Sequence, residues 1–535
     1  MNDRPFWQRF PRALWIGGAT LASVGLFSIW LGQTAAQSRV PAQTAHTGEF
    51  RTTPTEVQSK AGADETGVAE NIETAESQPA ESTSAEPAYE PAFSAKGTFV
   101  ISNMESASGD VAIDEDQALH AAFSGYDGAS KDTVQYGYCE AENCGDAAAW
   151  KTVSIPLKSA STAQIEVTPD GHPRIFVTGW SPDHANGTDY FYGECNADCL
   201  EEANWQFSKI ASSADGIFSN IFRYRLPIRN FSLDHEGKPR FVYTDENYLV
   251  EPDHYGAFYM VCDDDCTEPS NWRETNLAYH IAESYRTESF SQPVLAIAPG
   301  GKVRVLASVY AFEKDGSDAP DALYYYACDS DCEDRDSWVR ADVLGTGGGS
   351  YPNPTWDLDL LPDGRPRIVL FAGHGMEQAD LSHQLIYAWC DADCGDDANW
   401  FGSTVQPGEG HGESPDLELT PEGKPRIAFL SGGGELAYSI CNVDCETDHP
   451  QWRSDLVEST SVPQTERPQA LPFHCDGEVW NGFMPKLALS GERAHIAYDL
   501  TVEARCLYKD YEDPIPSATF HEIFRGSRVV SMSMS

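Results

Sequence analysis

Twelve of the 14 cysteines stand in pairs with three or four residues between them, and acidic residues or asparagine lie inside every pair. The pairs are Cys139/Cys144, Cys195/Cys199, Cys262/Cys266, Cys328/Cys332, Cys390/Cys394 and Cys441/Cys445. Two chemistries suit such spacing, a thiolate metal site and a disulfide. A zinc-type site needs about four converging ligands, whereas repeated units hold their pairs apart. The spacing therefore predicts six disulfides, each contributing about 2 kcal/mol because its loop is short.

The last two cysteines, Cys475 and Cys506, belong to a repeat that lacks the paired motif. Matching Cys506-Leu507-Tyr508 to Ala322-Leu323-Tyr324 puts Cys506 at the start of a third strand. Cys475 then lies in the connection that leads into the same repeat. We expect a seventh disulfide between them, as is usual for exported chains.

The cysteine pairs belong to a longer repeat. In the clearest copy Tyr387 stands before Cys390, and Trp400 follows Cys394 by six residues. The corresponding tryptophans are spaced 52 to 67 residues apart: Trp150, Trp205, Trp272, Trp338, Trp400 and Trp452. Before the hairpin of this copy, an alternating strand, a Gly-containing turn and a more apolar strand predict two further β-strands.

These first two strands occur seven times, at Asp110–Ser124, Ile165–Thr178, Phe231–Thr244, Val294–Tyr310, Trp356–Ala372, Asp416–Ser431 and Lys486–Asp499. Four short antiparallel strands per unit, repeated radially, describe a propeller blade. The fold class predicted is all-β, a seven-bladed β-propeller. Thr98–Ser102 and Thr519–Val530 are the candidates for closing the ring, since an open ring would expose edge strands.

A repeated charge pattern accompanies the hairpins. One Arg begins the second strand of five blades: Arg174, Arg240, Arg304, Arg367 and Arg426. An Asp precedes the second Cys of the same blades: Asp198, Asp265, Asp331, Asp393 and Asp444. Blade one has His120 and Asn143 at these positions, so both partners are missing together. We expect an Arg–Asp pair under each of the five blades, with a solvated row of charges as the alternative.

Two segments precede the ring. Residues 1–36 hold three arginines, an apolar run from Ala13 to Gly32 and small residues at Thr34-Ala35-Ala36. This is the pattern of a signal peptide or an N-terminal membrane anchor, and the two remain open. Residues 37–96 are rich in Ala, Thr, Ser, Glu and Pro, which predicts a disordered acidic linker before a propeller over residues 97–535.

With 83 acidic against 36 basic residues, the formal net charge is −47. Such a chain repels nucleic acid and anionic lipid, so we expect neither as a partner. The membrane is expected only through the N-terminal segment. The export pattern and the cysteines together predict an extracytoplasmic, monomeric protein that is secreted, periplasmic or held at the cell surface.

A hairpin with Asp in its turn and Trp opening the fourth strand resembles the Asp-box of the sialidase-like (BNR) propellers. In that family the box reads Ser-x-Asp-x-Gly-x-x-x-Trp, whereas Cys-Asp-x-Asp-Cys stands here, so the resemblance is one of architecture over about Thr98 to Arg525. It implies an active site at the end opposite the hairpins, with an arginine triad and a Tyr–Glu pair. Phe222–Pro227 is slightly similar to the Phe-Arg-Ile-Pro segment of that family. The seven blades counted here differ from its six.

Variable loops at the end opposite the hairpins are where binding residues are expected. The candidate ligand contacts are Trp180, His184, Arg225, Asp245, Tyr248, Tyr255, Tyr310, Trp356, His374, His411 and Trp480. Aromatic rings beside polar groups suit a sugar or a peptide. The alternative is that many of these aromatics only pack loops onto the ring.

No cofactor is expected, but one group of histidines and a carboxylate keeps a divalent-cation site as an alternative. His374 and His383 share a loop, and His411 and Glu413 lie in the next connection. Imidazoles and a carboxylate can hold a metal with an open position. A solvated polar loop is the alternative.

The function expected is a binding or scaffold module for a glycan or a protein ligand. The alternative is a carbohydrate-active enzyme of the hydrolase or lyase type, with its site on the variable-loop end. Asp245 with Glu246 or Asp253 is a carboxylate pair of the kind such hydrolases use.

Overall fold

The structure is a computed structural model of the 535-residue chain. It describes residues 51–52, 93–102, 105–126, 132–140, 144, 147–158, 160–181, 187–213, 229–245, 256–277, 285–313, 322–345, 355–372, 384–406, 413–431, 435–447, 449–458, 475–491, 493–508 and 517–534. The predicted signal or anchor segment, most of the linker and most variable loops lie outside these ranges.

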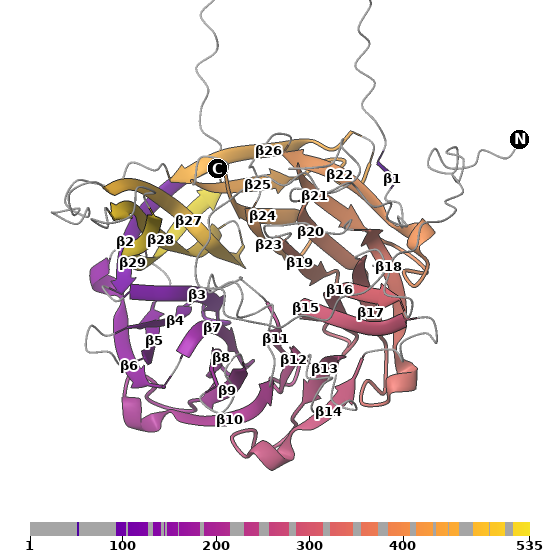
Figure 1. Cartoon of the computed structure of the whole chain (residues 1–535), viewed down its shortest axis with the longest axis horizontal. Helices are drawn as coiled ribbons and strands as arrows, with labels where there is room; N and C mark the ends of the chain where they lie inside the picture. The colour runs from indigo at the N-terminus through magenta and orange to yellow at the C-terminus, as the bar shows by residue number, and fades with distance from the viewer. Residues whose placement is uncertain are drawn as a thin grey trace, which may run out of the picture.

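Seven four-stranded antiparallel sheets surround a common axis, which confirms the predicted seven-bladed β-propeller (Figure 1). Blade one is β3 (Glu105–Ile113), β4 (Leu119–Tyr126), β5 (Asp132–Cys139) and β6 (Lys151–Pro156). Blade two is β7 (Ala160–Val167), β8 (Pro173–Trp180), β9 (Thr188–Glu194) and β10 (Gln206–Ser213). Blade three is β11 (Phe231–Leu233), β12 (Pro239–Asp245), β13 (Gly256–Val261) and β14 (Arg273–Asn276). Blade four is β15 (Tyr285–Ile297), β16 (Val303–Glu313), β17 (Ala322–Cys328) and β18 (Val339–Gly345).

Blade five is β19 (Thr355–Leu360), β20 (Pro366–Ala372), β21 (Gln384–Trp389) and β22 (Phe401–Gln406). Blade six is β23 (Glu413–Leu419), β24 (Pro425–Leu430), β25 (Leu436–Cys441) and β26 (Trp452–Glu458). Short 3-10 turns precede the fourth strands of blades one to five: η2 (Ala147–Ala149), η3 (Glu202–Asn204), η4 (Pro269–Asn271), η5 (Arg335–Ser337) and η6 (Asp397–Asn399). The first strand of each blade faces the axis and the fourth lies outside (Figure 1).

Blade seven closes the ring with strands from both parts of the chain. It is β27 (Cys475–Ser490), β28 (Arg493–Tyr508) and β29 (Ser517–Met534), and its outermost strand is β2 (Phe93–Ser102). β2 pairs antiparallel with β29, as between Phe99 and Val529. Both segments expected to close the ring therefore do so, in one blade, and no free edge is left between the first and last blades.

The core lies between blades and not within one. Seven clusters of buried apolar side chains each join two successive blades, such as the cluster of Leu306 in blade four with Ile368 and Trp400 in blade five. Within the linker, β1 (Arg51–Thr52) pairs in parallel with the outermost strand of blade five, β22. This pairing was not expected from the composition of the linker.

The repeated Tyr and Trp of the hairpins connect neighbouring blades. Trp400 of blade five packs edge-on against Tyr325 of blade four, with ring centroids 5.1 Å apart. Its Nε1 donates to the carbonyl of Cys394, at 3.1 Å. The corresponding contacts are Tyr136–Trp205, Tyr192–Trp272, Tyr259–Trp338 and Tyr387–Trp452. The hairpins of blades two to six therefore each anchor their blade to the preceding one.

Candidate functional site: the axis and the upper end of the ring

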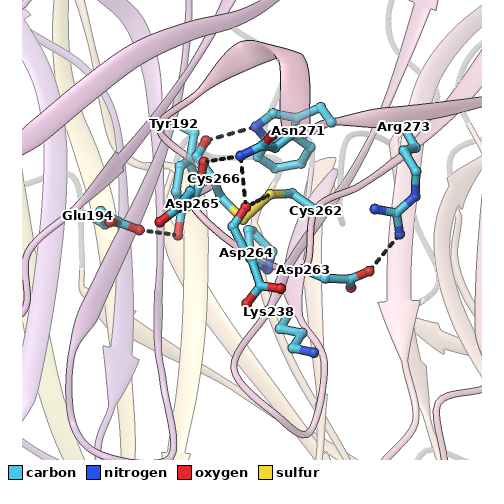
Figure 2. Close-up of a disulfide and its surroundings, with 12 residues drawn as sticks. Tyr192, Glu194, Lys238, Cys262, Asp263, Asp264, Asp265, Cys266, Asn271 and Arg273 are labelled. Atoms are coloured by element: carbon cyan, nitrogen blue, oxygen red, sulfur yellow. Dashed lines mark hydrogen bonds and ion pairs between the residues drawn. A yellow bond between two sulfur atoms is a disulfide. The ribbon is translucent and has the colours of Figure 1, made fainter.

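The six hairpins and the turns between first and second strands lie at the same end of the ring, called here the lower end. Figure 2 shows the Cys262–Cys266 bridge, with the amide of Asn271 donating to the carbonyls of Asp264 and Asp265. Among the described residues, no group of His, Cys, Asp and Glu is arranged to hold a metal. All six predicted hairpin disulfides are present: Cys139–Cys144, Cys195–Cys199, Cys262–Cys266, Cys328–Cys332, Cys390–Cys394 and Cys441–Cys445.

The six bridges differ in burial, which the similar spacing of the pairs did not predict. The first cysteine of every pair is buried, whereas three of the second cysteines, Cys199, Cys332 and Cys394, remain partly exposed. Cys199 packs at the margin of the cluster between blades one and two, and its carbonyl accepts from Nε1 of Trp205 at 2.8 Å. The Cys195–Cys199 bridge is therefore a structural bridge of blade two, as predicted, but its second sulfur is less shielded than the first.

The Arg residues of the lower end bind the hairpins, but not through the Asp that was predicted. Arg367 donates from Nη1 to the carbonyls of Pro366 and Cys390, at 2.9 and 3.2 Å, and from Nη2 to Asp391, at 2.9 Å. The partner is thus the residue after the first Cys. In the other four blades it is Asp263, Asp329, or the amide oxygen of Asn196 or Asn442.

The expected partner, the Asp before the second Cys, has another role. Asp198, Asp265, Asp331, Asp393 and Asp444 all have φ between 49° and 56°. Asp and Asn adopt this left-handed conformation more readily than other non-glycine residues. These residues close the tight turn, so the predicted Arg–Asp pairs were wrong in their acidic member.

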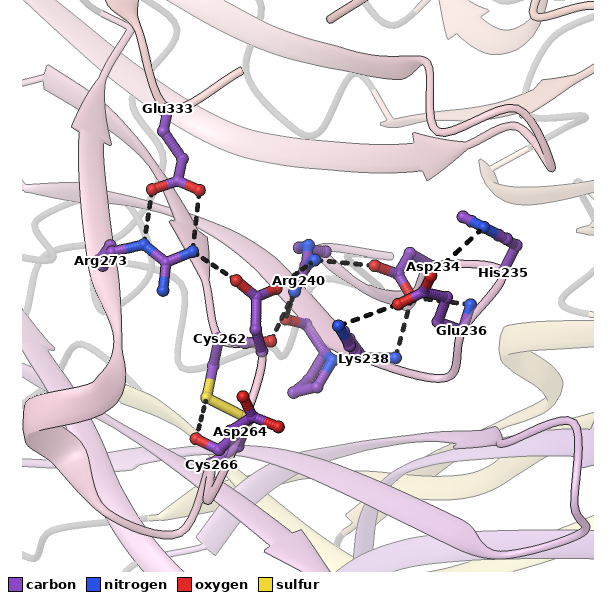
Figure 3. A network of polar contacts seen from close by, with 12 residues as sticks. Asp234, His235, Glu236, Lys238, Arg240, Cys262, Asp264, Cys266, Arg273 and Glu333 are labelled. Atoms are coloured by element: carbon purple, nitrogen blue, oxygen red, sulfur yellow. Dashed lines mark hydrogen bonds and ion pairs between the residues drawn. A yellow bond between two sulfur atoms is a disulfide. The ribbon is translucent and has the colours of Figure 1, made fainter. Parts of the chain in front are cut away.

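Charged residues also join neighbouring blades at the lower end. In blade three Arg240 contacts Asp234 and Asp263, and Arg273 continues from Asp263 to Glu333 in the hairpin of blade four (Figure 3). The Arg273 hydrogen bonds hold the pKa values of Asp263 and Glu333 below their usual range. A groove of about 710 Å³ lies beside this network, lined by Arg240, Tyr259 and several acidic residues.

The opposite, upper end of the ring is not uniform. In blade five the first two strands have six and seven residues. In blade four they have 13 and 11, and the three C-terminal strands of blade seven have 16, 16 and 18. All of these hairpins close at equivalent lower-end turns, so the additional length lies at the upper end.

We call these two extensions the upper arms: Tyr285–Ser291 with Ser308–Glu313 in blade four, and Cys475–Phe483 with Asp499–Tyr508 in blade seven. In blade seven the strand begins eleven residues before Lys486, roughly 35 Å along an extended chain. Two predicted ligand contacts, Tyr310 and Trp480, lie on the upper arms. The arms are thus the part of the described backbone that rises above the ring.

The register of blade seven corrects the position of Cys506. It lies near the end of the second strand, β28, and not at the start of the third. Cys475, which begins β27, is its direct partner in the ladder. Antiparallel partners have Cα atoms about 4.5–5.5 Å apart, within the range a disulfide needs. Their side chains lie outside the described part, so the seventh disulfide stays a prediction.

The axis carries a belt of buried polar residues that the sequence did not suggest. One register position recurs in all seven blades, on the innermost strand or, in blade three, directly before it: Asp110, Gln164, Asn230, Val294, Asp357, Asp416 and Lys486. All but Val294 are polar, and none of these polar residues is more than 7% exposed. Buried polar groups need partners.

Most of the partners lie on the next blade. Asp110 accepts from the backbone N–H of Ile165 at 3.0 Å, Asp357 from Leu417 at 2.8 Å, and Asp416 from Leu487 at 2.7 Å. Gln164 accepts from the N–H of Phe231 in the same manner, at 3.2 Å. The belt therefore links the inner strands at four junctions, between blades one and two, two and three, five and six, and six and seven.

Arg229, which precedes β11 in blade three, crosses the axis. Its guanidinium donates to Glu418 at 2.6 Å and to Asp416 at 2.9 Å, both in blade six, and to the carbonyl of Leu487 in blade seven. Lys486 binds the other oxygen of Asp416, at 2.7 Å. These two cations face six axial carboxylates among the described residues: Asp110, Glu166, Asp357, Asp359, Asp416 and Glu418.

Three of these acids are buried and three are partly buried, and their excess over the cations changes how the axis binds protons. Burial, together with the nearby Asp416, raises the pKa of Asp357 to about 7. Among the described residues Asp357 Oδ1 has no hydrogen-bond partner that would stabilise its charge. Burial also raises the pKa of Glu166 to about 7, against the lowering effect of Arg229. The axis therefore holds carboxyl groups that exchange protons near neutral pH, a property typical of acid–base sites.

The structure describes the side chains of only some of the predicted ligand contacts. Asp245 ends β12 at the upper end and is 3% exposed. Trp356 is 4% exposed within the core between blades four and five, so it has the packing role given above as the alternative. Trp180, Tyr310, Trp480 and Glu413 are described by their backbone alone. His184, Arg225, Tyr248, Tyr255, His374, His383 and His411 lie outside the described residues.

No protein-family model matches the chain, and no curated protein matches its sequence. Solved structures share its fold. A family PL25 ulvan lyase bound to a GlcA-Rha3S ligand has 10% identity and a TM-score of 0.46, over 80% of this chain and 95% of its own. The GH93 α-L-arabinofuranosidase of Fusarium graminearum, in complex with arabinobiose, has 13% identity and a TM-score of 0.41, over 69% and 98%. A protein of unknown function from Dyadobacter fermentans has 12% identity and a TM-score of 0.39, over 83% and 100%. These similarities concern the fold and carry no argument about activity.

Proposed function

We propose that this propeller is an extracytoplasmic binding module that holds a glycan or protein ligand at its upper end, between the arms of blades four and seven. The observation that carries the proposal is the difference between the two ends. The lower end repeats one clamp in blade after blade, whereas the upper end is raised in two blades. Loops and extensions on a rigid scaffold are the usual place for recognition.

The six disulfides support the extracytoplasmic part of the proposal, because such bridges persist in oxidising compartments. No helix within the described residues is long and apolar enough to cross a membrane. The apolar run Ala13–Gly32 lies outside those residues and, as a signal peptide or anchor, would supply export.

A panel of neutral and anionic polysaccharides, scored for retention and for released products, tests the proposal. We expect retention without products. Tyr310→Ala and Trp480→Ala should each weaken retention about tenfold, as loss of an aromatic stacking contact does. Val443→Ala is the matched control, since Val443 is 49% exposed in a lower-end hairpin. Equal weakening by the control would contradict an upper-end site, and silence across the panel would leave a protein as the ligand.

The axial carboxyls favour one second function, a glycan-acting hydrolase or lyase. Glu166 and Asp357 both have a pKa of about 7, which suits a general acid or base. Released sugar products from the same panel, abolished by Glu166→Gln with retention unchanged, would establish this function in place of simple binding.

A further inference from the structure

The outer face of blade five differs from that of every other blade in its charge. Its outermost strand, β22, reads Phe-Gly-Ser-Thr-Val-Gln and holds no charged residue. Every other outermost strand holds at least one: Lys151 in β6, Lys209 in β10, Arg273 in β14, Arg340 in β18, Arg453 in β26 and Lys96 in β2. Charges on edge strands are a common protection against pairing with another chain. β22 lacks that protection.

A strand of the same chain lies on this edge. Arg51 and Thr52 of β1 pair in parallel with Phe401 and Gly402. Other outermost strands of the described ring have no such partner. The outermost strand that lacks charged residues, β22, is therefore also the one that pairs with a further strand.

The sequence around Arg51–Thr52 suits a strand. Phe50-Arg51-Thr52-Thr53 places an aromatic residue beside two threonines, and both residue types favour strands. Phe50 is the only aromatic residue between residues 31 and 88. Pro54 follows and suits the end of such a strand, because it has no N–H to donate.

We infer that the edge of blade five is a strand-docking site, and that its occupant is the linker segment around Arg51–Thr52 of this chain. Backbone hydrogen bonds of a parallel pair hold the segment, as in other cases of strand addition. Phe401 stands directly opposite Arg51, where blades three and six carry Arg273 and Arg453 at the equivalent register position. An uncharged residue at this position avoids repulsion of Arg51.

Docking would shorten the tether of the ring. If the apolar run stays in a membrane, which rests on the proposed anchoring, about 18 residues separate it from Arg51 and about 60 separate it from β2. At about 3.4 Å per residue these span at most roughly 60 and 200 Å. The docked segment thus holds the flank of blade five toward the membrane instead of leaving the ring free to rotate.

A cross-linking experiment on the full chain tests the docking. The variant Arg51→Cys/Phe401→Cys should form a new disulfide in most molecules, found by peptide mapping without reduction. Arg51→Cys/Arg453→Cys places the second thiol at the equivalent position of blade six and should form at least tenfold less. Equal yields in the two variants, or no bridge in the first while the six hairpin disulfides remain intact, would overturn the inference.

A charge exchange gives a second readout by hydrogen exchange of the segment around Arg51. Phe401→Arg should speed exchange there at least threefold, Phe401→Glu should not, and Arg51→Glu in the Phe401→Arg background should restore protection. Identical exchange in all four proteins would contradict docking. Neither readout involves a ligand at the upper end, so docking and the proposed binding function can fail independently.

Discussion

The carboxyl groups at the lower end of the ring and those at its axis have pKa values shifted in opposite directions. At the lower end, arginines on successive blades repeat the same bonds, and Arg273 lowers the pKa of Asp263 and Glu333 at half-exposed positions. At the axis the corresponding position holds Asp in three blades and Gln, Asn, Val or Lys in the other four, and burial raises the pKa of Asp357 and Glu166. The repeated ion pairs of the lower end thus favour charged carboxylates. The acids of the axis, where the residue type varies from blade to blade, resist ionisation. The lower end holds the ring together, whereas the axis and the upper arms are where one blade differs from the next.

Removing the arginine that crosses the axis should have the largest effect. Arg229→Met leaves Glu418 and one side of Asp416 without a cation, and breaking a buried pair costs about 3–5 kcal/mol. Because Arg229 retains 18% exposure, we expect about 3 kcal/mol, measured by chemical unfolding. Arg273→Met is the control at the lower end and should cost less than about 1 kcal/mol, since its pairs are exposed. Equal losses would remove the distinction between the two regions.

Removing one hairpin disulfide should cost less. Cys390→Ala/Cys394→Ala removes a bridge that closes a short loop. Because the bridge restricts the unfolded chain, its loss should lower the free energy of unfolding by about 2 kcal/mol. Ligand retention should be unchanged at temperatures where the ring stays folded, because the hairpin lies at the end opposite the arms. Lost retention in a folded variant would place the ligand at the lower end.

The clamp itself can be tested by a conservative change. Arg367→Lys replaces a fork that binds Glu446, Asp391 and two carbonyls with a single ammonium, at a site only 1% exposed. Unpaired carbonyls should lower the free energy of unfolding by about 1.5 kcal/mol. Arg365→Lys, at 41% exposure, is the control and should change it by less than about 0.5 kcal/mol. An unchanged free energy of unfolding in Arg367→Lys would show that the fork geometry of the guanidinium does not contribute to stability.

Repetition also explains what sequence reasoning recovered. The pairs of first and second strands and the six disulfides followed from patterns that occur several times, and the two closing segments followed from the need to leave no exposed edge strand. The axial belt did not, because Asp110, Gln164 and Lys486 share a position but no chemistry, so no motif connects them. Its signal was present only as a polar residue at a fixed distance before the turn in six of the seven blades. The Arg partner was misassigned for a local reason, since Asp393 is held in a left-handed turn and only the register brings Asp391 to Arg367.

The upper arms were foreseen only in part. Tyr310 and Trp480 were expected to contact ligand as loop residues, whereas both lie on strands that continue beyond the ring. Cys506 was placed on the wrong strand because a match of three residues cannot distinguish a long second strand from a third.

The pH dependence of stability tests the contrast between axis and lower end most directly. A carboxyl whose pKa is raised to about 7 by folding still holds its proton between about pH 4 and 7, where the unfolded chain has lost it. Asp357 therefore contributes a stability that falls as pH rises through this window. The decisive measurement is the free energy of unfolding of the unmodified chain and of Asp357→Asn at pH 5 and pH 8. We predict that the free energy of unfolding of the variant minus that of the unmodified chain is larger at pH 8 than at pH 5, by on the order of 1 kcal/mol. The same difference at both pH values, or a loss at pH 8, would contradict an axis that resists ionisation.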